Sequence, residues 1–320
     1  MDTPTLRDAI LFFSEFENCK MYMVSLRWPD GKVRCPVCNS EKVCYLAKNR
    51  LWKCYTPHPK PRFTLKTGTI FEDSPIPLEK WLPTVWLILN CKNGVSSYEI
   101  HRGIGVTQKT AWFMLHRIRL AMQAGSFRKF SGTVEADETY VGGKAANMHA
   151  YKLEQLKMRG LVRAGTEGKA IVMGLVERET GEARTKVLPN VRAYHVRTNV
   201  IENVEKGSTV YSDSLRSYRN LPVDGFIHDF VDHTKEYVKD QVHTNKMENF
   251  WSLLKRALKG TYVSVEPFHL QAYCDEQAFR YNNRRFTDAD RFALAMKNIV
   301  GRRITYKELI GKVEAGGSCG

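Results

Sequence analysis

The sequence contains no apolar run long enough to cross a bilayer, and it is short of acidic residues. No stretch approaches the roughly 20 consecutive apolar residues that a membrane-spanning helix needs. The opening decapeptide is too polar and too acidic for a secretory signal peptide, so we expect a cytoplasmic protein with no membrane partner. The 320 residues, 43% of them hydrophobic, suit two or three globular domains, one of them with a substantial core.

The shortage of acidic residues leaves a strong positive charge. Lys and Arg number 49 against 34 Asp and Glu, which gives a formal net charge of +15. Such a balance favours a polyanion as partner. Charge alone supports only weak, salt-sensitive DNA binding, with a dissociation constant of roughly 10⁻⁴–10⁻⁶ M. A soluble basic surface, or one attracted to anionic lipid, would carry the same charge, so the composition supports a nucleic-acid partner without establishing specificity.

Half of the cysteines lie close together near the N-terminus. Four of the eight fall within twenty residues, and two of these, Cys35 and Cys38, form a Cys-x-x-Cys turn. In a basic cytoplasmic protein this clustering indicates a metal site more than disulfides. Tetrahedral zinc requires two further soft or borderline ligands.

The remaining zinc ligands are less regular. Cys54 is followed by proline at position 57 where a second Cys-x-x-Cys would have cysteine, but His58 can supply an imidazole nitrogen. Cys44, in a strand-like run, competes as the fourth ligand or is a small buried hydrophobe. We predict a zinc ribbon held by Cys35, Cys38, Cys54 and His58, and a degenerate ribbon without metal is the alternative.

A helical segment with a glycine turn follows. A short helix near 96–102, a glycine turn at 103–105 and a Thr107-capped second helix have the order of a helix-turn-helix motif. The N-terminal part of the second helix meets base edges in that motif. The expected DNA contacts are Gln108, Lys109, Trp112 and, from a basic cluster further along, Arg117, whereas Ala111, Met114, Leu115 and Ile118 are expected to pack. Many helical hairpins of this kind bind no DNA.

The pattern changes to strands from Gly132. The expected elements are strands at 132–142, 170–176, 183–188 and 208–213, with a helix at 194–204 before the last strand. Three strands, a helix and a strand are the core order of the ribonuclease-H-like α/β fold, in which the first and fourth strands lie side by side. We therefore predict a multidomain chain with an N-terminal helical segment (1–30), a zinc ribbon (31–72), a helix-turn-helix segment (73–128), a ribonuclease-H-like catalytic domain (129–285) with a basic insertion (143–169), and a C-terminal tail (286–320).

Three acidic residues are placed for a metal site. Asp137 lies in the first strand, Asp213 ends the fourth, and Glu248 lies in the first turns of a helix that begins near Thr244. Clustered carboxylates repel one another unless a cation neutralises them. Their hard oxygens suit Mg²⁺, and two such ions roughly 3.5–4 Å apart can flank a reacting phosphate.

Each acidic residue also has a structural interpretation on its own. Asp213 could cap the helix that follows it, and Glu248 could be a first-turn glutamate favoured by the helix dipole. Asp137 has two acidic neighbours, of which strand alternation places Glu135 on the same face and Glu138 on the opposite one. The combination of fold order and spacing favours the catalytic interpretation of the three residues.

Together these segments resemble the DDE transposases of bacterial insertion sequences, in the zinc-ribbon group related to the Merlin elements. The matching stretches are 35–38, 63–71, 134–143, 210–213, 243–256 and 279–284. The irregular ribbon after Cys54 is the main departure from the family pattern, and it leaves the fourth zinc ligand open.

The resemblance implies a transposase acting on double-stranded DNA at the nucleoid. Asp137, Asp213 and Glu248 would hold two Mg²⁺ ions, with Mn²⁺ as a substitute, for cleavage at the element's terminal inverted repeats and 3′-hydroxyl strand transfer into target DNA. A homodimer or larger assembly on DNA is expected. Four residues near Glu248 would contact DNA: His243, Asn245, Lys255 and Arg256. The insertion would clamp DNA or be a solvated loop.

Two alternatives use the same features differently. A catalytically inactive DNA-binding regulator would not need clustered negative charge facing phosphates, so the three acidic residues argue against it. A nuclease of the same fold that resolves branched DNA would have less use for a zinc ribbon and a helix-turn-helix, which fit the recognition of DNA ends better.

Overall fold

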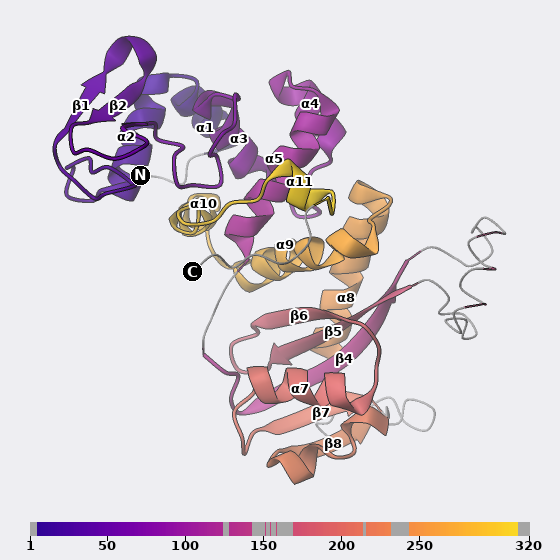
Figure 1. Cartoon of the computed structure of the whole chain (residues 1–320). Coiled ribbons are helices and arrows are strands. Elements are labelled where there is room, and N and C mark those ends of the chain that lie inside the picture. Colours follow the sequence, from indigo (N-terminus) through magenta and orange to yellow (C-terminus); the bar gives the residue numbers. More distant parts are fainter. Residues whose placement is uncertain are drawn as a thin grey trace. The chain divides into compact units, whose positions relative to one another are not determined.

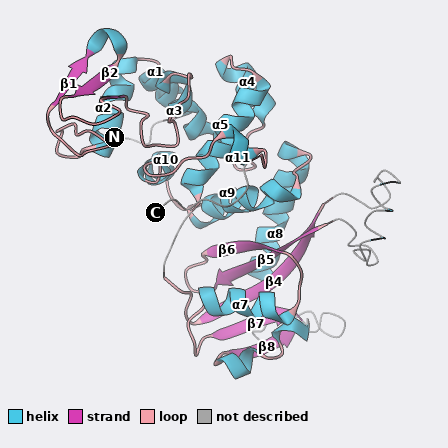
Figure 2. Ribbon diagram, in the orientation of Figure 1, coloured by secondary structure: helices cyan, strands magenta, loops and turns pink. Residues whose placement is uncertain are grey.

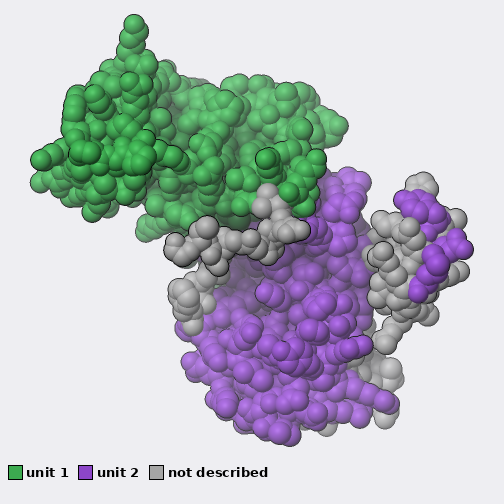
Figure 3. Space-filling model, viewed as in Figure 1, with its two compact units in different colours: residues 1–122, 285–320 green, residues 123–284 purple. Residues whose placement is uncertain are grey.

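The computed structural model describes residues 5–123, 128–142, 169–213, 216–231 and 243–312, together with Tyr151, Glu154 and Met158. The chain divides into two compact units, one made of residues 1–122 and 285–320 and the other of residues 123–284 (Figure 3). Apart from Lys169 and those three isolated residues, the predicted insertion lies outside the described residues. Within the described parts, no helix combines the length and apolar character needed to cross a membrane.

Unit 1 contains a small antiparallel sheet of the predicted ribbon. Its order is β1 (Val43–Leu46), β2 (Leu51–Cys54), β3 (Arg62–Phe63) (Figure 2). The buried ring of Trp52 lies between two other rings, with centroid distances of 4.6 Å to Tyr45 and 5.9 Å to Phe63. This aromatic cluster gives so short a sheet a core of its own.

The remainder of unit 1 is mainly helical and includes described residues from 285 to 312. Phe292 has ring centroids 5.3–5.6 Å from those of Phe13, Tyr22 and Trp86. Part of the segment predicted to be a C-terminal tail therefore contributes to this core. The helices are α1 (Leu6–Phe13), α2 (Phe16–Arg27), α3 (Leu78–Asn90), α4 (Ser97–Ile104), α5 (Gln108–Met122), α10 (Asp288–Lys297) and α11 (Tyr306–Leu309).

Helices α4 and α5 have the predicted order. Ser96 and Glu99 form a capping box at the start of α4, and Gly105 ends it in the left-handed conformation at φ +62°. The four residues expected to pack from α5 (Ala111, Met114, Leu115 and Ile118) are all buried. The two helices and their glycine turn are therefore present, and their role as a DNA-reading motif stays a prediction.

Unit 2 is built on a five-stranded mixed sheet (Figure 1). The order is β6 (Ala183–Leu188), β5 (Ala170–Glu177), β4 (Thr133–Val141), β7 (Thr209–Asp213), β8 (Ile227–Val231). Strands β4, β5 and β6 pair antiparallel, whereas β7 runs parallel to β4 and β8 parallel to β7. The predicted adjacency of the first and fourth strands of this domain is confirmed, and β8 is an edge strand that the sequence did not predict.

Helices cover both faces of this sheet (Figure 1). One face packs on α7 (Ala193–Asn203), where Val134 and Ala136 of β4 meet Val196 and Val200. The other face packs on α8 (Asn245–Ala257) and α9 (Leu270–Asn282). Because successive side chains of a strand point to opposite faces, the odd-numbered residues 135 and 137 of β4 face the α8 side.

Gly174 lets α8 approach the sheet closely. It pairs with Asp137 across β4 and β5, and a Cβ there would lie 2.2 Å from Met247 Cε and 2.8 Å from the Trp251 ring. The missing side chain provides the space that these two α8 side chains occupy.

Candidate functional site

Three carboxylates gather where β4 and β7 lie side by side. Carboxylate oxygens of Asp137, Glu138 and Asp213 all lie within 4.8 Å of one another. The parallel register pairs Glu135 with Tyr211, so two residues further along each strand bring Asp137 beside Asp213. Two of the three predicted metal ligands are therefore brought together by the sheet itself.

Glu138 joins this cluster although its side chain belongs to the other face. The Tyr218 hydroxyl, fully buried in the core on the α7 side, donates a hydrogen bond to Glu138 Oε1. The predicted side for Glu138 is therefore correct, yet its carboxylate still reaches both aspartates. The sequence identified Glu138 only as a neighbour of Asp137, and its membership in the cluster required the structure.

Helix α8 runs alongside β4 with matching contacts. The backbone N–H groups of Lys246 and Met247 donate to Glu135, and four residues after Met247 the indole Nε1 of Trp251 donates to Asp137 Oδ2 at 2.9 Å. Two residues along a strand, as from Glu135 to Asp137, span about 6.6 Å, and four residues along a helix, as from Met247 to Trp251, span about 6 Å. Because these distances nearly match, both contacts can form between the same strand and the same helix.

Glu248 lies between these two contacts, one turn before Trp251. It is exposed and falls outside the 4.8 Å group, but its charge is among those that raise the pKa of Asp137. The structure therefore brings the third predicted ligand to the same region without placing it within the tight cluster.

The electrostatics of the cluster oppose its full ionisation. Burial, followed by the charge of Asp213, raises the pKa of Asp137 to about 6 against the opposing hydrogen bond from Trp251. Burial also raises the pKa of Glu138 to about 8, with Asp213 and Asp137 adding to the effect. Carboxylates in this arrangement are stabilised in their ionised form by a bound cation.

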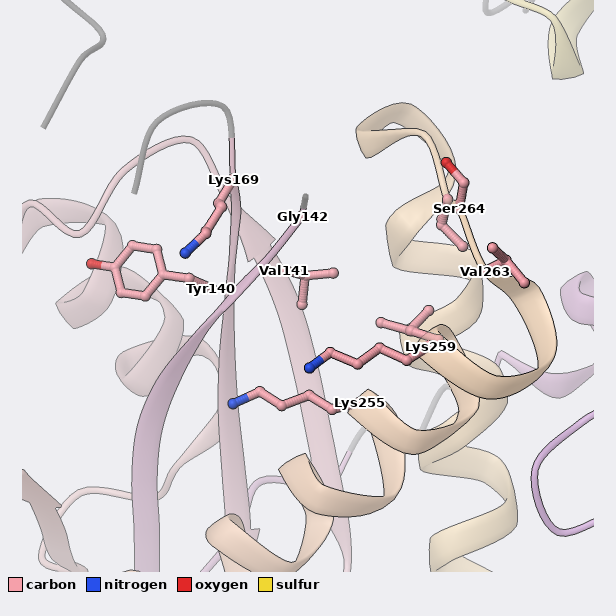
Figure 4. A pocket seen from close by; sticks show the side chains of 10 residues that line it. Tyr140, Val141, Gly142, Lys169, Lys255, Lys259, Val263 and Ser264 are labelled. Carbon is pink, nitrogen blue, oxygen red and sulfur yellow. The ribbon is translucent and has the colours of Figure 1, made fainter. Parts of the chain in front are cut away.

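A basic cavity lies beyond the cluster along β4 and α8 (Figure 4). It has a volume of about 700 Å³ and is lined by the end of β4, residues 263–265 and three lysines, Lys169, Lys255 and Lys259. Lys255 and Lys259 are exposed, sit one helical turn apart and extend toward β4 in Figure 4. Lys255, predicted as a DNA contact, lies seven residues after Glu248, about 10 Å along the helix axis.

The other predicted DNA contacts near α8 differ in their placement. Asn245 and Arg256 are exposed. His243 is half-buried, and its Nδ1 lies 2.8 Å from an Arg178 guanidinium nitrogen and 3.6 Å from Glu135 Oε1. The His243 side chain therefore contacts Arg178 and Glu135, just before the start of α8, instead of lying on an open surface.

The predicted contacts on α5 are largely engaged within unit 1. Gln108 donates to Ser97 Oγ at 2.8 Å, and the half-buried Trp112 packs edge-on against His116. Arg117 is only 3% exposed and donates to the Glu72 carbonyl, so its burial disagrees with the predicted DNA contact. Lys109 is exposed, with its ammonium 4.7 Å from the centre of the Tyr306 ring.

Four potential zinc ligands meet in the ribbon. One ligand atom from each of Cys35, Cys38, Cys54 and His58 lies within 4.8 Å of the others. Cys35 Sγ is 3.4 Å from His58 Nε2, and Cys38 Sγ is 3.6 Å from Cys54 Sγ. Tetrahedral zinc, with Zn–S about 2.3 Å and Zn–N about 2.0–2.1 Å, requires separations of about 3.5 Å for S–N and about 3.8 Å for S–S, so these positions fit it.

Cys44 is not part of this group. It is exposed on β1, with its thiol toward the Tyr45 carbonyl, whereas His58 occupies the fourth position that the sequence left open. Burial by itself would raise the pKa of Cys54, but hydrogen bonds from the Thr56 backbone, His58 and the other thiols lower it to about 7. A lowered thiol pKa favours the thiolate that binds metal.

Comparison with known proteins shows two family matches along the chain. Residues 129–282 match the family model of the ISXO2-like transposase domain, and residues 15–56 match that of the transposase zinc-ribbon domain. An uncharacterized protein in transposable element ISH50 of Halobacterium salinarum is 30% identical over 243 residues, which cover 74% of this chain and 81% of that protein. An uncharacterized transposase-like protein of Haemophilus influenzae is 32% identical over 99 residues, covering 31% of this chain and 80% of that one.

One matching solved structure is too distant to support an argument about this chain. A chain of the simian T-cell lymphotropic virus intasome in complex with PP2A regulatory subunit B56 gamma aligns with 59% of this chain and 66% of its own length. The sequence identity is 8% and the TM-score 0.30, which is too low to show a shared fold.

Proposed function

The chain belongs to the ISXO2-like transposases and has the N-terminal zinc ribbon of transposases, and we propose that it cleaves insertion-sequence ends and joins their 3′-hydroxyls to target DNA. One observation carries this proposal. Asp137 lies beside Asp213 in the sheet, and Glu248 on α8, although outside their tight cluster, is near enough for its charge to raise the pKa of Asp137.

The donor set fits Mg²⁺. It consists of carboxylate oxygens alone, and burial, followed by the charge of Asp213, raises the pKa of Asp137, so a divalent cation would stabilise its ionised form. Asp137, Asp213 and Glu248 would hold the metal. When bound, Mg²⁺ supplies the positive charge that stabilises the attacking and leaving oxygens of an in-line displacement at phosphorus.

The protein's own groups position the reactants. The Trp251 N–H donates to Asp137 Oδ2 and thereby orients that carboxylate. Lys255 and Lys259 line a cavity two to three helical turns beyond Glu248, where their ammonium groups can pair with the phosphates of a DNA strand that leaves the site. Asn245 and Arg256 of α8 are also exposed.

The other parts of the chain would recognise and assemble the ends. The strand order of unit 2 and the side-by-side placement of β4 and β7 support a ribonuclease-H-like domain. The α4–α5 pair, with Lys109 exposed near the start of α5, supports a helix-turn-helix. Zinc would stabilise the ribbon, and concerted action on two ends would require two or more chains on DNA.

The test uses DNA from either side of the protein's own gene. Wild-type protein with Mg²⁺ should cut one strand at a defined end and join it to a second duplex, whereas Asp213→Asn should bind the same DNA without cutting. Equal cleavage by both proteins would contradict the proposal. Binding without cleavage by the wild type, on flanks that contain an inverted repeat, would instead favour a DNA-binding regulator.

A further inference from the structure

Glu135 of β4 is a fully buried carboxylate two residues before Asp137. Its exposed fraction is 0%. Oε2 accepts the backbone N–H groups of Lys246 at 2.8 Å and Met247 at 3.1 Å, and Oε1 accepts Arg178 Nε at 2.8 Å. A strand side chain therefore caps a helix more than a hundred residues away in the sequence.

The start of α8 depends on this cap. The first four N–H groups of a helix have no partner within it, and Thr244 at the N-cap makes no side-chain hydrogen bond to them. Glu135 satisfies two of these groups and places its negative charge at the positive end of the helix dipole. Removing such a carboxylate would leave buried donors unsatisfied, which is costly.

Arg178 extends the anchor to the segment before α8. A guanidinium nitrogen of Arg178 donates to the His243 carbonyl at 2.7 Å and lies 2.8 Å from His243 Nδ1. The Lys246 ammonium in turn donates to the Arg178 carbonyl. The pair with Arg178 also supplies the countercharge that a buried carboxylate requires.

We propose that Glu135 is a positioning residue of the metal site, because it fixes the start of α8 on β4 and thereby sets the position of Glu248 relative to Asp137. Glu248 directly follows Met247, whose N–H Glu135 holds. A slip of α8 by one residue would move Glu248 by about 1.5 Å along the axis and rotate it by about 100°, enough to lose a metal ligand. The metal part of this inference rests on the proposed function, whereas the anchoring of α8 does not.

A matched control is available on β5. Glu177 is 2% exposed, pairs with Arg128 through both oxygens and accepts the Ser131 N–H at 2.8 Å. Within the described residues, its carboxylate bonds to Arg128, Ser131 and Thr180, all of which lie outside α8. Glu177→Gln therefore removes the same kind of buried ion pair from the same sheet without touching the start of α8.

The experiment compares Glu135→Gln and Glu177→Gln with the wild type by hydrogen exchange and by Mn²⁺ binding to the protein alone. In Glu135→Gln we expect the hydrogen-exchange rate of the first-turn amides of α8 to rise about tenfold or more. The Mn²⁺ dissociation constant should also rise about tenfold or more, which is the range typical of groups that orient metal ligands. In Glu177→Gln both quantities should stay within about twofold of the wild type, even where stability falls. Unchanged α8 exchange in Glu135→Gln, or equal effects in the control, would overturn the inference.

If Glu135→Gln does not fold, Arg178→Lys is the second variant for the same two measurements. It keeps a positive charge beside Glu135 but cannot bridge to both the Glu135 carboxylate and His243 as the planar guanidinium does. Faster α8 exchange and weaker Mn²⁺ binding are expected in it, and wild-type values would overturn the inference. If wild-type protein neither binds Mn²⁺ nor cleaves DNA, the proposed function fails, while the exchange measurement still decides whether Glu135 anchors α8.

Discussion

The indole N–H of Trp251 donates a 2.9 Å hydrogen bond to Asp137, directly over the strand position where Gly174 has no side chain. Helix α8, strand β4 and Gly174 of β5 thus all contact the region around Asp137, a predicted metal ligand. The bond orients that carboxylate and opposes the rise in its pKa that burial and Asp213 cause.

Trp251→Phe should shift the pH dependence of DNA cleavage upward. The ring remains but the donor is lost, so the pKa of Asp137 in the metal-free protein should rise above about 6, and protons should then compete with Mg²⁺ for this carboxylate up to a higher pH. Loss of one hydrogen bond of about 1 kcal/mol corresponds to roughly 0.5–1 pH unit on the acid limb. Trp81→Phe, which removes the Trp81 to Ser74 hydrogen bond in unit 1, is the control and should leave the profile unchanged. An unshifted limb in Trp251→Phe would refute the role of this bond.

Gly174→Ala should destabilise unit 2 and displace α8. The new Cβ would approach Met247 Cε to 2.2 Å and the Trp251 ring to 2.8 Å, so these side chains must move. Overpacking of this kind typically costs 1–3 kcal/mol, which urea unfolding would measure, and cleavage should fall as well. Gly103→Ala, at a helical position with open space around it, should be neutral or slightly stabilising. If Gly174→Ala had the stability and the cleavage activity of the wild type, α8 would not lie against the sheet at Gly174 as closely as described.

Glu138→Gln should flatten the pH dependence of stability in Mg²⁺-free buffer. Folding raises the pKa of Glu138 from 4.5 to about 8, because of burial first and then the two aspartates. A raised pKa means that this contribution to stability is complete below pH 4.5 and is lost as the pH rises through about 8. Relative to Glu138→Gln, the wild type should therefore lose free energy of unfolding across this window. A difference between the two proteins that does not vary with pH would contradict the shift.

The ribbon should lose zinc when a clustered ligand is removed and keep it when Cys44 is changed. Cys38→Ser and His58→Ala each remove one of the four ligands that lie within 4.8 Å of one another. We expect about one zinc ion per chain in wild type and Cys44→Ser, and a clear loss of zinc and of ribbon stability in the other two. Elemental analysis of the purified proteins measures this directly. Stoichiometric zinc in Cys38→Ser would rule out the site.

Much of unit 2 could be predicted from local sequence signals. The alternating and buried runs predicted β4, β5, β6 and β7, and strand order then placed Asp137 beside Asp213. The edge strand β8 was missed because Ile227 and Phe230 on it are exposed, so its sequence has no buried run.

Features that depend on distant partners were not visible in the sequence. Phe292 looks like part of a tail until its partners Phe13 and Trp86 are known. Arg117 belongs to a basic cluster in the sequence, but its side chain is buried and donates a hydrogen bond to the backbone carbonyl of Glu72. Glu135 shares a face with Asp137, a signal that could have identified it, yet its role required Arg178 and the start of α8.

The most direct test concerns which glutamate completes the metal site. Glu138 lies within the tight cluster and Glu248 outside it, although the proposed function assigns metal binding to Glu248. Cleavage of end DNA in Mg²⁺ should be compared between Glu248→Gln and Glu138→Gln, with DNA binding measured in parallel. We predict a loss on the order of 10³-fold or more for Glu248→Gln, with binding retained, and a loss of about tenfold or less for Glu138→Gln. The reverse order would assign the third ligand to Glu138 and contradict the account.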